Sequence, residues 1–167
     1  MEYGKTAFET ERLILKQLTL EEIEQFESRK IDIYDNNEFS IYLKSNNQKI
    51  GMIGFSYVDN KKVELRYGIA TIYRNNGYMT EILKSFIKYL FDNDIDEIVV
   101  IVKISNLPSN RVVNKLGFKF VKRFDYNEFG VCNYYIMKKW VYRYLLKKSK
   151  YKKDVNYDKE SCNSGIT

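Results

Sequence analysis

The sequence predicts an α/β (α+β) domain built on a mixed, mostly antiparallel twisted sheet. Residues 63–102 read as a strand, a long amphipathic helix and a second strand. The second strand, Ile98–Val102 (IVVIV), is apolar throughout and directly follows the helix, which is typical of a parallel pair covered on both faces. Residues 118–124 and 131–139 indicate an antiparallel hairpin. A chain of 167 residues can form one domain with a sizeable core.

The N-terminal half begins with a predicted strand and a capped helix. Arg12–Leu18 alternates apolar and polar residues and is expected to form the first strand. Thr19 then caps a helix that ends near Ser28, and Glu22 completes a capping box. Three further strands are expected over Phe39–Leu43, Lys49–Val58 and Val63–Ala70, with turns at SNNQ and DNKK.

The longest predicted helix is defined by apolar residues at the three-and-four spacing of one buried stripe. These residues are Met79, Ile82, Leu83, Phe86, Ile87, Leu90 and Phe91. The segment Asp92–Asp96 ends the helix. A second, shorter helix is expected over Ser105–Leu116, and Gly117 is placed to end it in the left-handed conformation.

The net positive charge of the chain is confined to its C-terminal end. Of 28 basic and 22 acidic residues, 19 of each fall within residues 1–137, whose net charge is therefore zero. Residues 138–153 carry eight basic residues and no acidic ones. We therefore expect residues 1–140 to form the domain and residues 141–167 a basic, then polar extension, part helical and part disordered. Such runs are commonly solvated tails, and the alternative is a weak contact with RNA or the ribosome.

The composition excludes several classes of function. The chain has no histidine and only two cysteines, Cys132 and Cys162, which excludes histidine-dependent triads and zinc sites of the usual kind. No metal is expected. No apolar run approaches the roughly 20 residues of a membrane span, and the N-terminus lacks the apolar core of a secretory signal. We expect no membrane association, and a reducing cytoplasm as the location.

Residues 73–81, YRNNGYMTE, join a predicted strand to the start of the longest helix. A loop of this kind exposes unpaired backbone N–H groups and the positive end of the helix dipole, which suit a phosphate or pyrophosphate. Gly77 lets the backbone approach a ligand without an intervening side chain, and Arg74 can add charge-assisted contacts. The alternative is an ordinary tight turn with a solvated arginine.

Two segments, in order and about thirty residues apart, resemble a known family. They read VELRYGIATIYRNNGYMTE and NLPSNRVVNKLGF, and TERLILKQLT precedes them near the N-terminus. Together they resemble the GCN5-related N-acetyltransferase (GNAT) family, which transfers acetyl groups from acetyl-CoA to amines, and within it the ribosomal-protein N-terminal acetyltransferases. The resemblance covers residues 9 to about 140. It implies helices on both faces of the sheet and a splayed parallel strand pair, with the pantetheine arm of acetyl-CoA in the gap.

The resemblance also implies which residues bind acetyl-CoA. Strand backbone groups would pair with the pantetheine arm, the loop would hold the pyrophosphate, Asn106 would bond the pantetheine and Ser109 would flank the thiol end. The implied residues are Tyr67, Ile69, Ala70, Arg74, Asn75, Asn76, Gly77, Tyr78, Met79, Thr80, Asn106, Ser109 and Arg111. The chain departs from the family pattern at three positions. Asn75 replaces a frequent glycine, Met79 replaces Gly or Ala, and Val113 replaces a tyrosine that reprotonates the thiolate in many members.

Acetyl transfer to an amine needs a base for the acceptor ammonium and a donor for the departing thiolate. The resemblance implies Glu64 as the base, and the alternative is a sheet residue paired with a lysine. Ser109 is expected beside the thiolate, and the alternative role, compatible with the first, is the N-cap of the second helix. The backbone N–H of Ile69 is expected to polarise the acetyl carbonyl.

The sequence thus predicts an acyl-CoA-dependent N-acyltransferase that moves acetyl from acetyl-CoA to a primary amine in a ternary complex. The acceptor classes are a protein N-terminus, a polyamine, an aminoglycoside or another small amine. Seven acidic residues within residues 21–38 favour a cationic acceptor, and the alternative is a solvated acidic face. A catalytically weak CoA-binding sensor or scaffold is the second class of function. The chain is expected to be a monomer or a homodimer.

Overall fold

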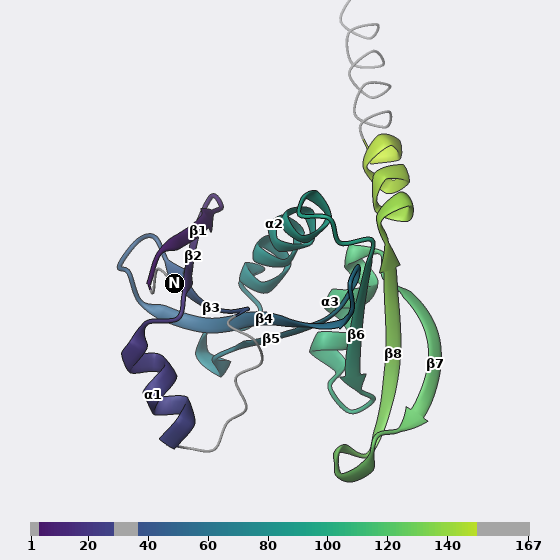
Figure 1. Ribbon diagram of the computed structural model, residues 1–167, viewed down its shortest axis with the longest axis horizontal. Coiled ribbons are helices and arrows are strands. Elements are labelled where there is room, and N and C mark those ends of the chain that lie inside the picture. Colours follow the sequence, from purple (N-terminus) through teal and green to yellow (C-terminus); the bar gives the residue numbers. More distant parts are fainter. Residues whose placement is uncertain (1–3, 29–36, 150–167) are drawn as a thin grey trace, which may run out of the picture.

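The computed structural model of the protein describes residues 4–28 and 37–149. In this part of the chain, eight strands form one sheet in the order β1-β2-β3-β4-β5-β6-β8-β7 (Figure 1). All neighbouring strands pair antiparallel except β5 and β6, which are parallel. The strands are β1 (Thr6–Glu9), β2 (Leu13–Gln17), β3 (Glu38–Leu43), β4 (Lys49–Asp59), β5 (Lys62–Ile69), β6 (Glu97–Lys103), β7 (Lys119–Asp125) and β8 (Val131–Lys138).

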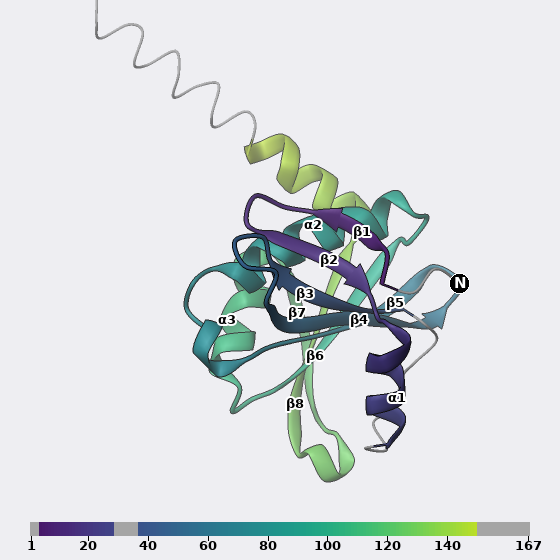
Figure 2. The same cartoon turned by 90° about the vertical axis from the view of Figure 1, so that its left-hand side faces the viewer.

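Helices cover both faces of this sheet. The helix α1 (Leu20–Ser28) lies on one face and α2 (Tyr78–Asp92) on the other, as two perpendicular views show (Figures 1 and 2). α3 (Leu107–Leu116) follows β6, and residues 139–149 continue from β8 as a further helix. Short 3-10 turns, η1 (Thr71–Tyr73) and η2 (Asn127–Phe129), lie in the connections. The predicted mixed, mostly antiparallel sheet with helices on both faces is confirmed.

The parallel strands β5 and β6 separate after three residue pairs. The pairs are Lys62 with Glu97, Val63 with Ile98 and Glu64 with Val99. Beyond them, β5 continues to Ile69 and β6 to Lys103 without pairing to each other. On its other edge β5 stays paired with β4, as far as Ile69 opposite Gly51. The two strands therefore diverge, and a gap opens between their C-terminal halves.

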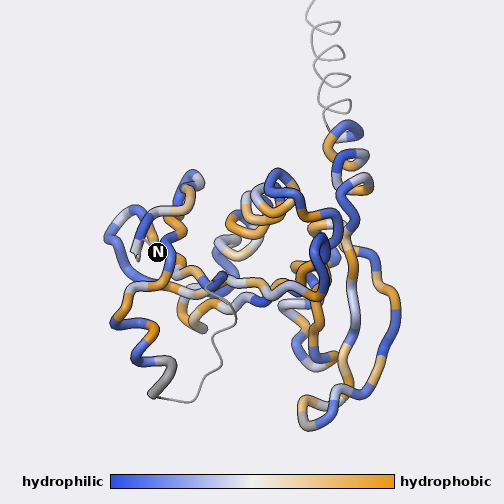
Figure 3. Tube along the Cα trace, in the orientation of Figure 1, coloured by the Kyte–Doolittle hydropathy of each residue, from blue (hydrophilic) through white to orange (hydrophobic). Residues whose placement is uncertain are grey.

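The helix α2 is held against the sheet by the apolar stripe that the sequence predicts. All seven stripe residues are buried. Phe86, at the centre, is fully buried, and its ring centroid lies 5.6 Å from that of Phe39 and 6.1 Å from that of Phe55. Figure 3 shows the hydrophobic residues along α2. Burial of one such side chain stabilises the fold by about 2–3 kcal/mol, so the stripe fixes the direction of the helix and the place where it begins.

Most of the predicted elements are present within one or two residues of the expected bounds. The capping box of α1 is confirmed, because Thr19 N–H donates to Glu22 Oε2 at 2.9 Å and Glu22 N–H donates to Thr19 Oγ1 at 3.2 Å. The predicted end of the second helix is also confirmed, since Gly117 ends α3 with a φ of 90°. β1 was not expected from the sequence; it precedes the strand that was expected to be first.

The start of α3 corrects one sequence-based interpretation. The helix begins at Leu107, not at Ser105, and its N-cap is Asn106. The Asn106 side chain accepts a hydrogen bond from Ser109 N–H at 3.2 Å. Ser109 is therefore not the N-cap, because it lies in the first helical turn and its backbone receives the capping bond. No helix in the described ranges, 4–28 and 37–149, is long and apolar enough to cross a membrane.

Candidate functional site

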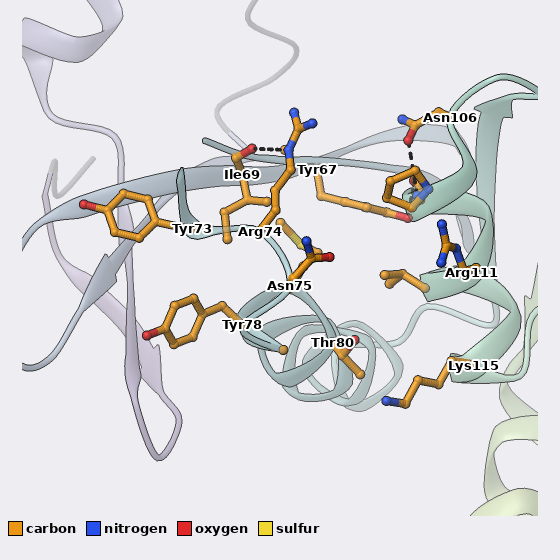
Figure 4. Close-up of a pocket in the computed structure, with 16 residues that line it drawn as sticks. Tyr67, Ile69, Tyr73, Arg74, Asn75, Tyr78, Thr80, Asn106, Arg111 and Lys115 are labelled. Carbon is orange, nitrogen blue, oxygen red and sulfur yellow. Dashed lines mark hydrogen bonds between the residues drawn. The ribbon is translucent and has the colours of Figure 1, made fainter. Parts of the chain in front are cut away.

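A cavity of about 340 Å³ lies where β5 and β6 diverge, between the start of α2 and the start of α3 (Figure 4). Its walls come from the end of β5, the loop before α2, the first turn of α2 and one side of α3. The lining residues are Tyr67, Gly68, Ile69, Tyr73, Arg74, Asn75, Gly77, Tyr78, Met79, Thr80, Asn106, Pro108, Ser109, Arg111, Val112 and Lys115.

The loop before α2 presents a run of backbone N–H groups to this cavity. Gly77 is the N-cap of α2 and has a φ of 77°, in the left-handed region that favours glycine. Asn75 also has a positive φ, of 63°, a conformation that asparagine tolerates better than most residues. The N–H groups from Gly77 to Thr80 have no acceptor among the described residues. They are the orphan donors of a helix N-terminus, and they point to an anion as the ligand.

The position of this loop is fixed by a cluster of contacts around Glu81, in the first turn of α2. Thr10 Oγ1 and Arg12 N–H both donate to Glu81 Oε1, at 2.5 and 2.9 Å, and Arg12 Nε donates to Oε2 at 2.7 Å. The same guanidinium donates to the carbonyl of Asn76 at 3.1 Å and lies over the ring of Tyr78 at 4.5 Å. We call these contacts the Arg12–Glu81 clamp. It joins the segment between β1 and β2 to the loop and to the helix start.

The other wall of the cavity, at the start of α3, is fixed by the side-chain amide of Asn110. Its Nδ2 donates to the carbonyls of Lys103 and Asn106, at 2.9 and 2.8 Å. Its Oδ1 accepts from Asn133 Nδ2 at 2.9 Å and from the Tyr135 hydroxyl at 2.8 Å. Three of these hydrogen bonds tie α3 to the end of β6 and to β8, and the fourth supports the N-cap of α3, so the two sides of the cavity are held by separate polar clusters.

A pair of hydroxyl groups bridges the gap from β5 to α3. The Tyr67 hydroxyl lies 2.7 Å from Ser109 Oγ, and Tyr67 extends from its strand toward α3 (Figure 4). Burial raises the pKa of Tyr67, so the phenol keeps its proton at neutral pH. When one of these two hydroxyls donates to the other, the second hydroxyl can still donate its own hydrogen to a third group in the cavity.

Backbone groups of β5 also face the gap. Ala70 N–H donates to the carbonyl of Ile50 in β4 at 2.9 Å. Because alternate residues of a strand direct their N–H groups to opposite edges, those of Tyr67 and Ile69 are directed to the open edge. The sheet therefore already uses the N–H of Ala70, and the free N–H groups at this edge are those of Tyr67 and Ile69.

All charged side chains that line the cavity are basic. Arg74 lies on the loop side, while Arg111 and Lys115 lie on α3 (Figure 4). Arg74 Nε donates to the carbonyl of Ile69 at 3.5 Å, a long bond that leaves the other guanidinium nitrogens available. With the helix N-terminus, these three cations give the cavity a positive potential that suits a ligand with several phosphate charges.

The structure gathers most of the residues that the sequence analysis selected. Eleven of the thirteen implied binding residues line the cavity, and Ala70 and Asn76 do not. Asn76 instead supports the loop, because its Nδ2 donates to the carbonyls of Tyr73 and Arg74 at 3.3 and 3.0 Å. The lining residues that the analysis missed are Gly68, Tyr73, Pro108, Val112 and Lys115. Lys115 could have been selected, because it lies one helical turn after Arg111.

Glu64 lies at the point where the strands diverge and is not part of the cavity wall. It belongs to the last parallel pair, opposite Val99, and is half-buried. Its neighbours Val63 and Leu65 are buried in the core, so the Glu64 side chain lies on the face of the sheet away from α2. No lysine of the described ranges forms an ion pair with it.

Two of the departures from the family pattern are buried. Met79 is 8% exposed and belongs both to the apolar stripe and to the cavity wall. Val113 is fully buried under α3 and does not line the cavity. Valine has no hydroxyl to take the place of the tyrosine hydroxyl of other family members. The hydroxyl of α3 that faces the cavity belongs to Ser109, one turn earlier on the helix.

The fold and the cavity define an α/β domain with a loop of unpaired backbone N–H groups beside a splayed parallel strand pair. The chain belongs to the acetyltransferase (GNAT) domain family, whose model matches residues 5–119. One similar curated protein is the uncharacterized N-acetyltransferase p20 of Bacillus licheniformis, 30% identical over 86 residues. These residues cover 50% of this chain and 48% of p20, so the chain spans about half the length of that relative.

Several solved structures share the fold. A GNAT-family acetyltransferase from Bacillus anthracis has a TM-score of 0.65 and 21% identity, over 78% of this chain and 96% of that one. A ribosomal-protein-S5-alanine acetyltransferase from Vibrio fischeri has a TM-score of 0.65 and 14% identity, over 80% of this chain and 97% of that one. A ribosomal L7/L12 alpha-N-protein acetyltransferase in complex with coenzyme A has a TM-score of 0.67 and 14% identity, over 80% of this chain and 98% of that one. At these identities the likeness shows the fold alone.

The clamp predicts a pH-dependent stability. Burial by itself would raise the pKa of Glu81, but the hydrogen bonds from Thr10 and from the backbone and guanidinium of Arg12 outweigh it and lower this pKa below its ordinary 4.5. A carboxyl with a lowered pKa contributes stability above its unfolded pKa, and that stability is lost as the pH falls through the folded value. Glu81→Gln should therefore cost roughly 2 kcal/mol at neutral pH and progressively less below pH 4.5.

Thermal melts of wild type and Glu81→Gln, at neutral pH and at about pH 3, measure this difference. Glu24→Gln, an exposed carboxylate of α1, is the matched control and should change the melting temperature little at either pH. A Glu81→Gln destabilisation of the same size at both values would show that the charge of Glu81 does not hold the loop.

Proposed function

We propose that this protein is an N-acetyltransferase that moves the acetyl group of acetyl-CoA to a primary amine by direct attack in a ternary complex. The observation that carries the proposal is the meeting, in one cavity, of a helix N-terminus with free N–H groups and an open strand edge. The first suits the pyrophosphate of coenzyme A, and the second suits the amide groups of its pantetheine arm. The family to which the chain belongs supports the same reading.

The proposed pose assigns a role to each wall of the cavity. The N–H groups from Gly77 to Thr80, with Arg74, bind the pyrophosphate. The open-edge backbone groups of Tyr67 pair with the pantetheine arm, and the Ile69 N–H faces the acetyl end of the same co-substrate. Asn106 uses its Oδ1 to cap α3. Its Nδ2 group has no acceptor in the described part of the chain and can donate to the pantetheine arm. The remaining cations, Arg111 and Lys115, face the other phosphate charges of the co-substrate.

The reaction exchanges a C–S bond for a C–N bond. The amine nitrogen attacks the acetyl carbonyl carbon, the bond from that carbon to sulfur breaks, and the products are an acetamide and the thiol of coenzyme A. The acceptor ammonium must first give a proton to a base, and the departing thiolate must gain one. We assign the first task to Glu64, acting through water, and the second to Ser109, whose hydroxyl contacts that of Tyr67 at 2.7 Å. The Ile69 N–H would polarise the acetyl carbonyl.

The acidic stretch at residues 21–38 carries less free negative charge than its sequence indicates. Glu22 forms an ion pair with Lys49, and Glu38 forms one with Arg66 at 2.9 Å. Residues 29–36, which include two of the seven acids, lie outside the described residues. The preference for a cationic acceptor therefore stays a proposal.

The proposed class of amine acceptor also depends on which subgroup of the family the chain resembles. The similar structures include two ribosomal-protein acetyltransferases, one of them in complex with coenzyme A. With the segments quoted above, this supports the ribosomal-protein N-terminal acetyltransferase subgroup and a protein N-terminus as one acceptor class beside polyamines and aminoglycosides. In this proposal residues 1–140 carry the transferase, and residues 141–167 are an extension to it. Buried Val113, in place of a thiolate-reprotonating tyrosine, favours a catalytically weak CoA-binding scaffold as the second candidate.

Release of free coenzyme A thiol from acetyl-CoA, measured with a panel of amines, tests the proposed activity. The panel contains peptides with free N-termini, the same peptides with blocked N-termini, a polyamine and an aminoglycoside. At least one free amine should give release that its blocked counterpart does not. Release no faster than the amine-free background with every acceptor, from protein that binds acetyl-CoA, would favour the scaffold.

Replacing the proposed base should slow transfer without weakening co-substrate binding. We expect Glu64→Gln to lower kcat by about a hundredfold, because general-base catalysis typically contributes on this scale. Its affinity for acetyl-CoA should stay near that of wild type, since Glu64 does not line the cavity. Asp92→Asn, an exposed carboxylate at the far end of α2, is the matched control. An unchanged kcat in Glu64→Gln would remove the assignment.

Removing the hydroxyls that face the thiolate should also lower kcat. Ser109→Ala is expected to cost about ten- to a hundredfold. Tyr67→Phe should cost less, because it removes only the partner of Ser109 and keeps the ring. The double variant should be no slower than Ser109→Ala if the two hydroxyls act in series. Multiplicative losses in the double variant would show that they act independently.

A further inference from the structure

The helix formed by residues 139–149 has an outward face whose composition differs from that of the rest of the domain. Its inward side packs on the domain, because the Tyr142 ring centroid lies 5.1 Å from that of Phe91 and Leu145 lies against Gly117. At 3.6 residues per turn, the side opposite Tyr142 and Leu145 carries Trp140, Arg143, Tyr144 and Lys147, at spacings of three and four residues. We call these four residues the outer face.

The two aromatic residues of the outer face are unusually open to solvent. Trp140 is 69% exposed and Tyr144 is 60% exposed, whereas large aromatic side chains are normally covered in a folded domain. The helix projects away from the sheet, and polar and apolar residues alternate along it (Figures 1 and 3). The two rings are one turn apart, with an exposed arginine between them.

The charge carried by this helix has one sign. Residues 139–149 contain four basic residues and no acidic ones. Two carboxylates beside the helix have basic partners: Asp92 pairs with Lys88, and Asp96 lies 3.9 Å from Lys139. The outer face therefore complements an anionic partner.

The aromatic and basic residues that alternate on the outer face favour one class of anionic partner over another, a single-stranded nucleic acid over a membrane surface. A membrane-surface helix needs a continuous apolar face. Leu145 lies against Gly117, and at 3.6 residues per turn Leu146, which is 45% exposed, lies beside Tyr142 and off the outer face, so neither leucine adds to an outward apolar face. A single-stranded nucleic acid offers bases that stack on exposed aromatic rings and phosphates that bind the cations between them. We infer that the outer face of helix 139–149 binds single-stranded nucleic acid, with Trp140 and Tyr144 as stacking platforms and Arg143 and Lys147 on the phosphates. This inference does not depend on the proposed acetyl transfer.

Trp140 is the single tryptophan of the chain, so its fluorescence reports on this face alone. Titration of the full chain with oligouridylate or oligoadenylate RNA should quench that fluorescence with saturation, in well-folded protein at physiological salt. Phosphatidylglycerol vesicles and a polyglutamate of equal charge are the comparison ligands. The absence of quenching by either oligonucleotide, or a stronger response to vesicles or polyglutamate, would overturn the inference.

Variants locate the binding and separate stacking from charge. Tyr144→Ala should weaken oligonucleotide binding by about tenfold, on the scale of one stacked base. Tyr57→Ala, which removes an exposed ring of β4, is the matched control and should have no effect. Equal losses in the two variants, or no loss in either, would place the binding elsewhere and overturn the inference.

The salt dependence tests the role of the cations. Replacing Arg143 and Lys147 together by glutamine should reduce the slope of log affinity against log salt by about 1.4, because each phosphate contact to a single strand contributes about 0.7. The matched control replaces Lys16 of β2 and Lys44 at the end of β3, far from β8 in the sheet, and should leave the slope unchanged. A slope unchanged by the first pair would contradict the assignment of these two residues to phosphates.

Discussion

The divergence of β5 and β6 after the pair Glu64–Val99 is the constraint on which the candidate site depends. Where two parallel strands stop pairing, backbone groups of both lose their partners and must find others. On β5 the open edge carries the N–H groups of Tyr67 and Ile69. The cavity, the hydroxyl bridge from Tyr67 to Ser109 and the position of Glu64 all follow from this one separation.

A gap of this kind is useful only if its two walls are fixed, and the structure fixes each by a different means. The apolar stripe of α2 sets the direction of the helix, and the Arg12–Glu81 clamp sets the loop before it. On the other wall, Asn110 uses its whole side-chain amide to attach α3 to β6 and β8. Preorganised donors need no rearrangement when a ligand arrives, which favours binding and catalysis alike.

Much of the fold and part of the candidate site could be predicted from the sequence, because these features depend on residues close together in the chain. The stripe of α2, the capping box at Thr19 and the terminating Gly117 each follow from local periodicity or from residue type at a helix end. The loop at Arg74 and Gly77 could be selected because a strand-to-helix junction exposes N–H groups by geometry.

The remaining features could not be predicted, because they depend on contacts between residues distant in sequence. Glu81 and Arg12 are 69 residues apart, and no local pattern indicates that they meet. Asn110 is likewise bonded to residues of β8. The cap of α3 was assigned wrongly because Asn106 and Ser109 are both good N-cap residues, and only the backbone conformation decides between them.

The central claim is that the main-chain N–H groups at the start of α2 hold the diphosphate of coenzyme A. Isothermal titration calorimetry with coenzyme A, 4′-phosphopantetheine and pantetheine tests this, because the last two ligands differ only in a phosphate that forms part of the diphosphate. We expect coenzyme A to bind, and pantetheine to bind at least about tenfold more weakly than 4′-phosphopantetheine, since charge-assisted hydrogen bonds are each worth more than 1.4 kcal/mol. Equal affinity for 4′-phosphopantetheine and pantetheine, or no binding of coenzyme A to well-folded protein, would show that these N–H groups do not hold the diphosphate.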